Sequence, residues 1–144
     1  MLVRLLPNQI PLVWEAIKYT IVQVELVQEK DYQNVFNYVI KSLLSDKAQC
    51  WVRLNDERRI VCLMLTEIQA NKMTGAKTLV PRVLYSWRPT GNDEWMRDIE
   101  ELKIFARKVE CSEIVVESAS PRMWDIYTLG GFKEKTRKYT FEVS

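Results

Sequence analysis

The first third of the chain carries two stretches whose apolar residues recur every three or four positions, which is the spacing of an amphipathic helix. Residues 11–27 contain the stripe Val13, Ile17, Ile21 and Val24. Residues 31–46 contain the stripe Tyr32, Val35, Val39 and Leu43. Pro11 near the first turn and Asp31 as an N-cap favour the starts of these helices. A short apolar run that ends at Pro7 precedes both and predicts an edge strand.

Strand patterns follow in the middle of the chain. Residues 49–54 alternate between apolar and polar, whereas residues 60–68 form a nearly unbroken apolar run that is typical of a buried strand. The polar residues 55–59 between them predict the turn of a hairpin. Residues 78–87 predict a further strand, in which Pro81 indicates a bulge or an edge position.

A third helix and a short strand come next. Residues 93–110 predict a helix with a single apolar face, formed by Trp95, Ile99, Leu102, Ala106 and Val109. Residues 113–118 are too few for a helix and rich in β-branched side chains, so they predict a buried strand.

The remaining residues predict one more helix and one more strand. The helix over residues 120–129 has Ser120 as its N-cap, proline at its first position, and Gly130 at its end. Residues 138–143 alternate apolar with polar side chains and predict a final strand. The resulting order, β-α-α-β-β-β-α-β-α-β, predicts a single mixed α/β domain over residues 1–144.

Composition narrows the function classes. The chain has no histidine, which excludes nucleophilic pairs with histidine and histidine-bound metals. Its three widely spaced cysteines favour a reducing compartment, and no apolar stretch reaches membrane-spanning length. Without a recognisable signal peptide, the expected location is the cytoplasm, with no membrane partner. A net charge of +2 does not favour nucleic acid as a partner.

The second half of the chain resembles the GNAT family, the acetyl-CoA-dependent N-acetyltransferases. The likeness lies in an aromatic–alanine–basic step at Phe105–Arg107, the strand at residues 113–118, and a helix that closes with Tyr127 and Gly131–Phe132. The element order also matches that fold. The resemblance implies that the strands around residues 83–85 and 114–116 run parallel, with the helix from Asp93 crossing between them. Family members splay these two strands to admit the cofactor.

The resemblance also implies a site for the pyrophosphate of coenzyme A, on a turn of the form Arg/Gln-x-x-Gly-x-Gly/Ala that precedes a helix. Free N–H groups at a helix start favour anions, and small residues allow close approach. The corresponding turn is RPTGNDEW, residues 88–95. Read from Arg88, it supplies Gly91 but has Asp93 where a small residue is expected. Counted back from Phe105 without gaps, Asp93 and Trp95 take the two glycine positions.

Neither register completes the motif. Carboxylates at positions 93 and 94 suit a helix dipole but repel a pyrophosphate. The simpler interpretation is that Asn92 caps the helix and the two carboxylates complement its dipole.

Further site residues follow from the same resemblance. Tyr127 corresponds to the tyrosine that protonates the departing coenzyme A thiolate in many members, although packing is the commoner role of a helix tyrosine. Glu67, ahead of Glu117, is the best candidate for the general base that an acetyl transfer needs, and its alternative is a solvent-facing strand residue. Ser120 stands where the family often has asparagine. The expected cofactor contacts are Tyr85, Arg88, Gly91 and Ser120.

A narrower resemblance links the chain to small GNAT-like proteins of tailed bacteriophages, through the spacing of Trp51, Thr66–Glu67 and Asp93–Trp95. Two functions stay open. One is direct transfer of an acetyl group from acetyl-CoA to an amine. The other is a non-catalytic binding or structural module in the host cytoplasm or the virion, with virion proteins or a second copy as partners. The incomplete turn favours the module, for which no cofactor is expected.

Overall fold

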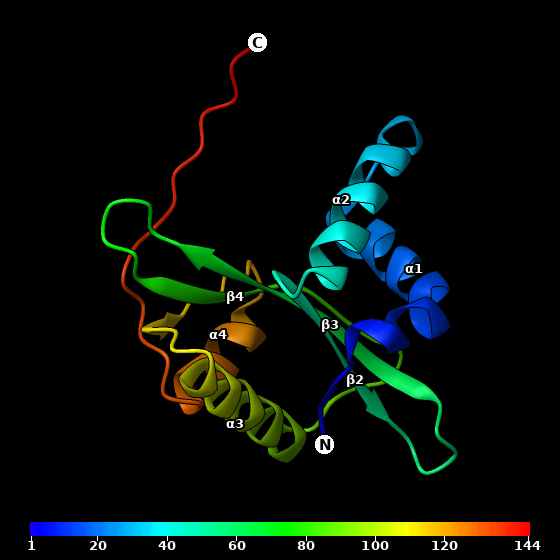
Figure 1. The fold of residues 1–144 in the computed structure, drawn as a ribbon. Coiled ribbons are helices and arrows are strands. Elements are labelled where there is room, and N and C mark those ends of the chain that lie inside the picture. The colour runs from blue at the N-terminus through cyan, green and yellow to red at the C-terminus, as the bar shows by residue number, and fades with distance from the viewer.

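The computed structural model describes residues 1–144 and contains one five-stranded sheet with helices on both of its faces (Figure 1). The strands are β1 (Val3–Arg4), β2 (Ala48–Leu54), β3 (Ile60–Ala70), β4 (Lys77–Ser86) and β5 (Glu113–Ile114). The helices are α1 (Trp14–Glu25), α2 (Tyr32–Leu44), α3 (Asn92–Lys108) and α4 (Pro121–Leu129). Two short 3-10 helices, η1 (Pro7–Val13) and η2 (Glu29–Asp31), precede α1 and α2. This order agrees with the sequence prediction up to α4.

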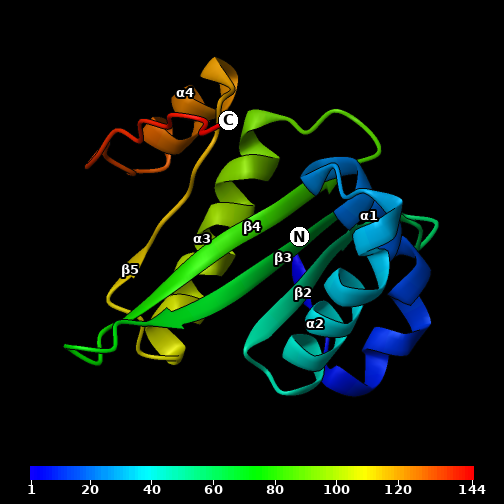
Figure 2. The same ribbon diagram turned by 90° about the horizontal axis from the view of Figure 1, so that it is seen from above.

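The strands lie in the order β1-β2-β3-β4-β5, and all neighbours are antiparallel except β4 and β5. The predicted parallel pairing of β4 and β5 is confirmed, with Thr78 opposite Glu113 and Leu79 opposite Ile114. The last hydrogen bond of this pair joins the Val115 N–H to the Leu79 carbonyl over 3.0 Å. Beyond this hydrogen bond β4 continues to Ser86, whereas the segment that follows β5 turns away toward α4 (Figure 2). The two strands therefore splay apart.

The alternation of side chains along the strands divides the core into two clusters. One lies between the sheet and α1 and α2, and its members are Ile10, Ile17, Ile21, Leu43, Ala48, Cys50, Val52, Leu63, Leu65 and Val83. The other lies beneath α3, and its members are Leu2, Trp51, Met64, Leu79, Leu102, Phe105 and Ala106. β2 and β3 contribute to both clusters, so both of their faces are buried.

A buried polar chain lies on the α3 face of the sheet. The Trp51 indole N–H donates to the Thr66 hydroxyl over 3.0 Å, and that hydroxyl donates to the Gln49 side-chain carbonyl over 2.7 Å. Thr66 is fully buried. Because each buried polar atom has a partner, this chain costs little and links β2 to β3.

A β-bulge interrupts the pairing of β3 with β4. Leu65 lies opposite Val83 and Thr66 lies opposite Pro81, so Arg82 is an extra residue without an opposite partner. The bulge predicted at Pro81 is thereby confirmed, and its physical reason is that proline cannot donate a ladder hydrogen bond. A bulge redirects the side chain of its extra residue.

The predicted final strand is wrong. Residues 138–143 pair with no strand, and the side chains of Tyr139, Phe141 and Val143 are almost fully exposed. The Lys135 ammonium group lies 3.2 Å from the Glu113 carboxylate at the first residue of β5, and the residues that follow continue without joining the sheet. The predicted buried strand at residues 113–118 is also shortened to β5, and Val115 is 38% exposed.

Candidate functional site at the start of α3

The turn that precedes α3 is capped in a way that the sequence reading missed. Gly91 is the N-cap, with extended backbone angles (φ −74°, ψ 162°), and Asn92 is the first helical residue. The prediction that Asn92 caps the helix is therefore wrong. Since glycine has no capping side chain, the carboxylate of Glu94 turns back and accepts a hydrogen bond from the Gly91 N–H over 3.2 Å.

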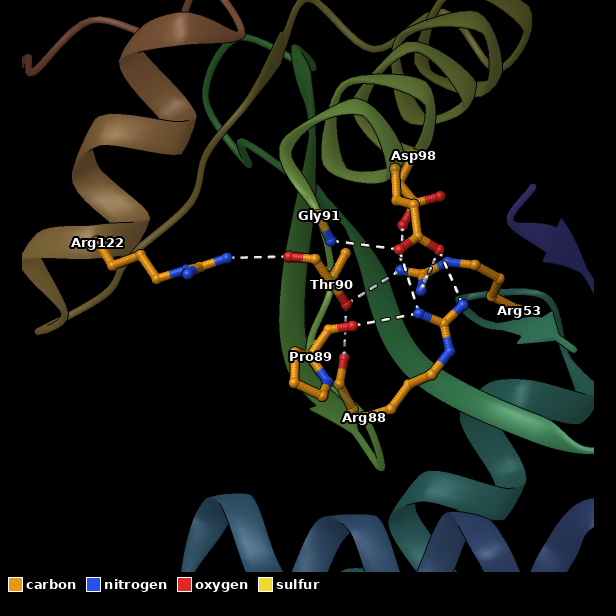
Figure 3. A network of polar contacts seen from close by, with 9 residues as sticks. Arg53, Arg88, Pro89, Thr90, Gly91, Asp98 and Arg122 are labelled. Carbon is orange, nitrogen blue, oxygen red and sulfur yellow. Dashed lines mark hydrogen bonds and ion pairs between the residues drawn. The ribbon is translucent and has the colours of Figure 1, made fainter.

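The Glu94 carboxylate is also held by Arg53 and Arg88, whose guanidinium groups lie close together in Figure 3. Arg88 donates to both of its oxygens, over 3.1 and 2.9 Å, and Arg53 approaches from β2 at 3.3 Å. The two Arg88 hydrogen bonds, followed by that from the Gly91 N–H, lower the pKa of Glu94 to about 2. The same contacts raise the pKa of Arg88. Glu94 is thus an anion at every physiological pH.

A buried ion pair lies directly beneath this cluster. Arg53 and Asp98 are 3% and 7% exposed, and an Arg53 Nη2 to Asp98 Oδ2 hydrogen bond of 2.7 Å joins them. Burial raises the pKa of Asp98, and the Arg53 hydrogen bond opposes that rise. Removing one member of such a pair leaves a buried charge alone, at a cost of about 3–5 kcal/mol. Arg53 and Asp98 therefore hold the start of α3 on β2.

Contacts from α4 complete the surroundings of the turn. Arg122 donates to the Thr90 carbonyl over 2.9 Å. A shallow hollow of about 470 Å³ opens between the turn and α4, with Trp87, Arg88, Trp95 and Arg122 on its walls. Two guanidinium groups and two indole rings are therefore the chemistry that this hollow offers.

Three of the donors that an incoming phosphate could use already have an acceptor. The Gly91 N–H and both Arg88 nitrogens bond to Glu94, which is one quarter exposed. A phosphate at this helix start would have to displace that carboxylate and would meet exposed Asp93 beside it. The chain's own side chain thus supplies the negative charge that the helix dipole favours. The carboxylates of Asp93 and Glu94 therefore oppose a pyrophosphate group at this turn.

The two candidates in α4 lie apart from this cluster. Tyr127 is half-buried, its ring centroid lies 5.5 Å from that of Phe132, and burial raises the pKa of its hydroxyl. Ser120 is the N-cap of α4, as predicted, but its hydroxyl makes no capping bond. Instead its N–H donates to the Ser118 hydroxyl over 3.1 Å. No hydrogen bond or ion pair joins Tyr127 or Ser120 to Glu94.

The two remaining candidates lie on the opposite face of the sheet, toward α1 and α2. Tyr85 packs edge-on against Tyr19 of α1 and against Trp87, with centroid distances of 5.7 and 4.9 Å. Glu67 borders a different cavity, where Arg82 lies 3.6 Å away. The structure therefore gathers Arg88 and Gly91, but places the other predicted residues elsewhere.

Three residues of the cluster escaped the sequence reading, namely Arg53, Asp98 and Arg122. A signal existed for two of them. Arg53 shares its strand face with Trp51, which predicts an inward side chain, and Asp98 follows Glu94 by four positions, which places both carboxylates on one helix face. Two neighbouring carboxylates on a half-buried helix face predict that cationic side chains lie nearby to pair with them. Nothing in the sequence indicates the contact that Arg122 makes.

The described residues also limit other chemistries. No group of three or more cysteine, aspartate or glutamate side chains is arranged to hold a metal ion. No helix has the length and apolar character that a membrane span requires. Cys50 and Cys62 are buried and form no disulfide, and burial raises the pKa of Cys50 to about 12. These thiols are therefore packing groups.

The fold resembles that of acetyltransferases of known structure. A predicted acetyltransferase from Clostridium acetobutylicum, solved with acetyl-CoA, superimposes with a TM-score of 0.74 at 13% identity, covering 99% of this chain and 95% of its own. Glucosamine-6-phosphate N-acetyltransferase from Arabidopsis thaliana gives a TM-score of 0.67 at 13% identity, covering 100% and 98%. An aminoglycoside acetyltransferase from a soil metagenomic sample gives 0.69 at 18%, also covering 100% and 98%.

These likenesses establish the fold. The chain is a mixed α+β domain with a GNAT-like fold, as the sequence predicted. No protein-family model and no curated protein sequence matches the chain. At such low identity, a shared fold does not carry a shared activity, so function has to be argued from the site.

Proposed function

We propose that this protein is a non-catalytic binding or structural module with a GNAT-like fold, in which Glu94 closes the place where coenzyme A phosphates would lie. The observation that carries the proposal is the occupation of the α3 start by that carboxylate. Four hydrogen bonds from Arg88, Arg53 and the Gly91 N–H hold it there. Hydrogen bonds to charged groups contribute about 1.5–3 kcal/mol each, and less where water competes.

Thermal unfolding with acetyl-CoA tests the proposal. A ligand at about 100 times its dissociation constant stabilises a folded protein by about 2.7 kcal/mol, which raises the Tm of a domain of this size by several degrees. We expect millimolar acetyl-CoA to leave the Tm unchanged. The Glu94→Ala variant frees the Arg88 guanidinium and the Gly91 N–H. It is therefore the matched control that tests whether removal of this carboxylate is sufficient for acetyl-CoA to bind. A clear Tm increase in the native protein would overturn the proposal.

The second candidate function is acetyl transfer from acetyl-CoA to an amine. What favours it is the hollow beside the turn, because Arg88 and Arg122 on its walls are suited to anionic phosphates. Tyr127 on α4 would then be the group that protonates the leaving thiolate. Release of free thiol from acetyl-CoA with an amine present, abolished by Tyr127→Phe and by Arg122→Ala, would establish this activity instead.

A role in a bacteriophage particle rests on sequence spacing alone. Two of the residues in that spacing, Trp51 and Thr66, have a packing role here, since both are buried and bonded to each other. The fold itself can therefore account for the spacing of these two residues, without a shared bacteriophage origin. The identity of the neighbouring genes tests this part, and co-purification with virions tests the proposed partners. A bacterial operon without virion genes would count against it.

A further inference from the structure

A second cavity lies away from α3, beneath the connection between α1 and α2. Its volume is about 760 Å³, within the range of small-molecule sites. Its floor is the edge of the larger core cluster, where Ile21, Leu43, Leu65 and Val83 are each at least nine-tenths buried. The partly buried Val27, Val35 and Val39 supply the apolar surface that is still exposed to water in the cavity. A ligand that covers this surface removes it from water, so the cavity favours a ligand with a bulky apolar group.

A strained residue stands at the rim of this cavity. Leu26 ends α1 in the left-handed conformation (φ 51°, ψ 44°), and its side chain is 80% exposed. For a leucine this conformation is unfavourable, and an apolar side chain gains nothing by facing water. Strained residues of this kind concentrate at ligand clamps. A ligand in the cavity would give the Leu26 side chain an apolar surface to cover.

Opposite charges meet at the mouth. Glu67 is 18% exposed, and the nearest donors to its carboxylate are distant, namely Gln69 at 3.3 Å, Tyr38 at 3.5 Å and Arg82 at 3.6 Å. Well-formed charge-assisted bonds are 2.7–2.9 Å long, so this carboxylate lacks a close partner. Arg82, which the bulge in β4 turns toward it, is half exposed. A ligand group can therefore reach each charge.

We propose that this cavity binds an α-amino acid with a large apolar side chain. Its ammonium group would pair with Glu67, its carboxylate with Arg82, and its side chain would cover the partly exposed valines of the cavity wall. The geometry favours this class because an α-amino acid carries its two charges on one carbon atom, and the two complementary charges here lie 3.6 Å apart. A simple amine or a simple carboxylate would satisfy only one of them.

Calorimetric titration of the full chain with three probes tests the proposal. L-phenylalanine carries both charges, phenethylamine lacks the carboxylate, and 3-phenylpropionate lacks the ammonium group. We expect phenylalanine to bind at least about tenfold more tightly than either analogue, the effect of one charged hydrogen bond. Equal affinity for all three probes, or no binding of phenylalanine at millimolar concentration, would overturn the proposal.

Matched variants assign each charge. Glu67→Gln should weaken the binding of phenylalanine about tenfold or more and leave the binding of 3-phenylpropionate unchanged. Arg82→Gln should weaken the binding of phenylalanine to the same extent and leave the binding of phenethylamine unchanged. Glu100→Gln and Arg107→Gln, on the exposed surface of α3, should change none of these affinities. Loss of all three probes together in the Glu67 variant would indicate a damaged fold or a different contact, and would refute the assignment.

Leu26→Gly separates strain from binding. Glycine adopts a left-handed conformation freely, so the variant should raise the Tm by about 2 °C or more. Because it removes the Leu26 side chain, it should also weaken the binding of phenylalanine. An unchanged affinity would refute the role of Leu26. This inference does not use the α3 site, so the two proposals fail separately. A Tm increase with acetyl-CoA, together with intact phenylalanine binding, would overturn only the proposal of a non-catalytic module.

Discussion

Replacing Glu94 with glutamine keeps the size of the side chain and removes its charge. A fall in the Glu94 pKa from 4.5 to about 2 corresponds to about 3 kcal/mol of stability as an upper limit. Because the side chain is one quarter exposed, solvent screening reduces this, and we expect Glu94→Gln to lower the free energy of unfolding by about 1–2 kcal/mol at pH 7. Urea unfolding followed by tryptophan fluorescence measures this difference.

The pH dependence of that difference is the sharper measurement. The pKa of Glu94 is lower in the folded than in the unfolded state, so its stability is fully present above about pH 4.5 and is lost as the pH falls through about 2. The gap between native protein and Glu94→Gln should therefore narrow between these two values. Glu100→Gln, exposed on the same helix, should show no gap. A gap that is absent at pH 7, or that stays constant with pH, would refute the reasoning about this cluster.

Three further outcomes follow from packing. Thr66→Val leaves its buried indole and amide partners unbonded and should cost about 2–4 kcal/mol in urea unfolding, whereas stability within 1 kcal/mol of the native protein would contradict the buried chain. Gly130→Ala brings a methyl group to 2.9 Å from Ile99 Cδ1 and should cost about 1–3 kcal/mol, with a neutral result counting against that close contact. Deletion of residues 138–143 should change the Tm by less than about 2 °C, because their apolar side chains are exposed, and a large decrease would show that they pack on the domain.

The regular elements were predictable because periodicity reports burial directly. The stripe through Ile99, Leu102 and Ala106 is the buried face of α3, and Pro81 marked the bulge of β4. The final strand failed for a reason that alternation cannot reveal. A strand needs a neighbour, and residues 138–143 pair with no other strand.

The site was predictable only in outline. Residues 88–95 were correctly identified as the helix entrance, and the mismatch at Asp93 signalled that the motif was incomplete. The carboxylate that accepts the Gly91 N–H is that of the next residue, Glu94. Its role depends on Arg53, which lies forty-one positions earlier, and on the rotation of α3 over β2. The contact between Arg53 and Glu94 depends on tertiary packing. The local sequence indicated only that Glu94 complements the helix dipole.

The buried pair of Arg53 and Asp98 also determines how α3 can sit on the sheet. A shift of the helix by one turn moves its side chains by about 5.4 Å, far more than a 2.7 Å hydrogen bond tolerates. Apolar packing alone would accept such a shift, because leucine and isoleucine side chains replace one another at modest cost. The shifted helix would leave the buried Arg53 charge with one carboxylate instead of two, because Glu94 and Asp98 lie one turn apart, and the lost pairing is costly in a dry environment. The ion pair therefore selects one register of α3 over its near neighbours and so fixes where the entrance of that helix points.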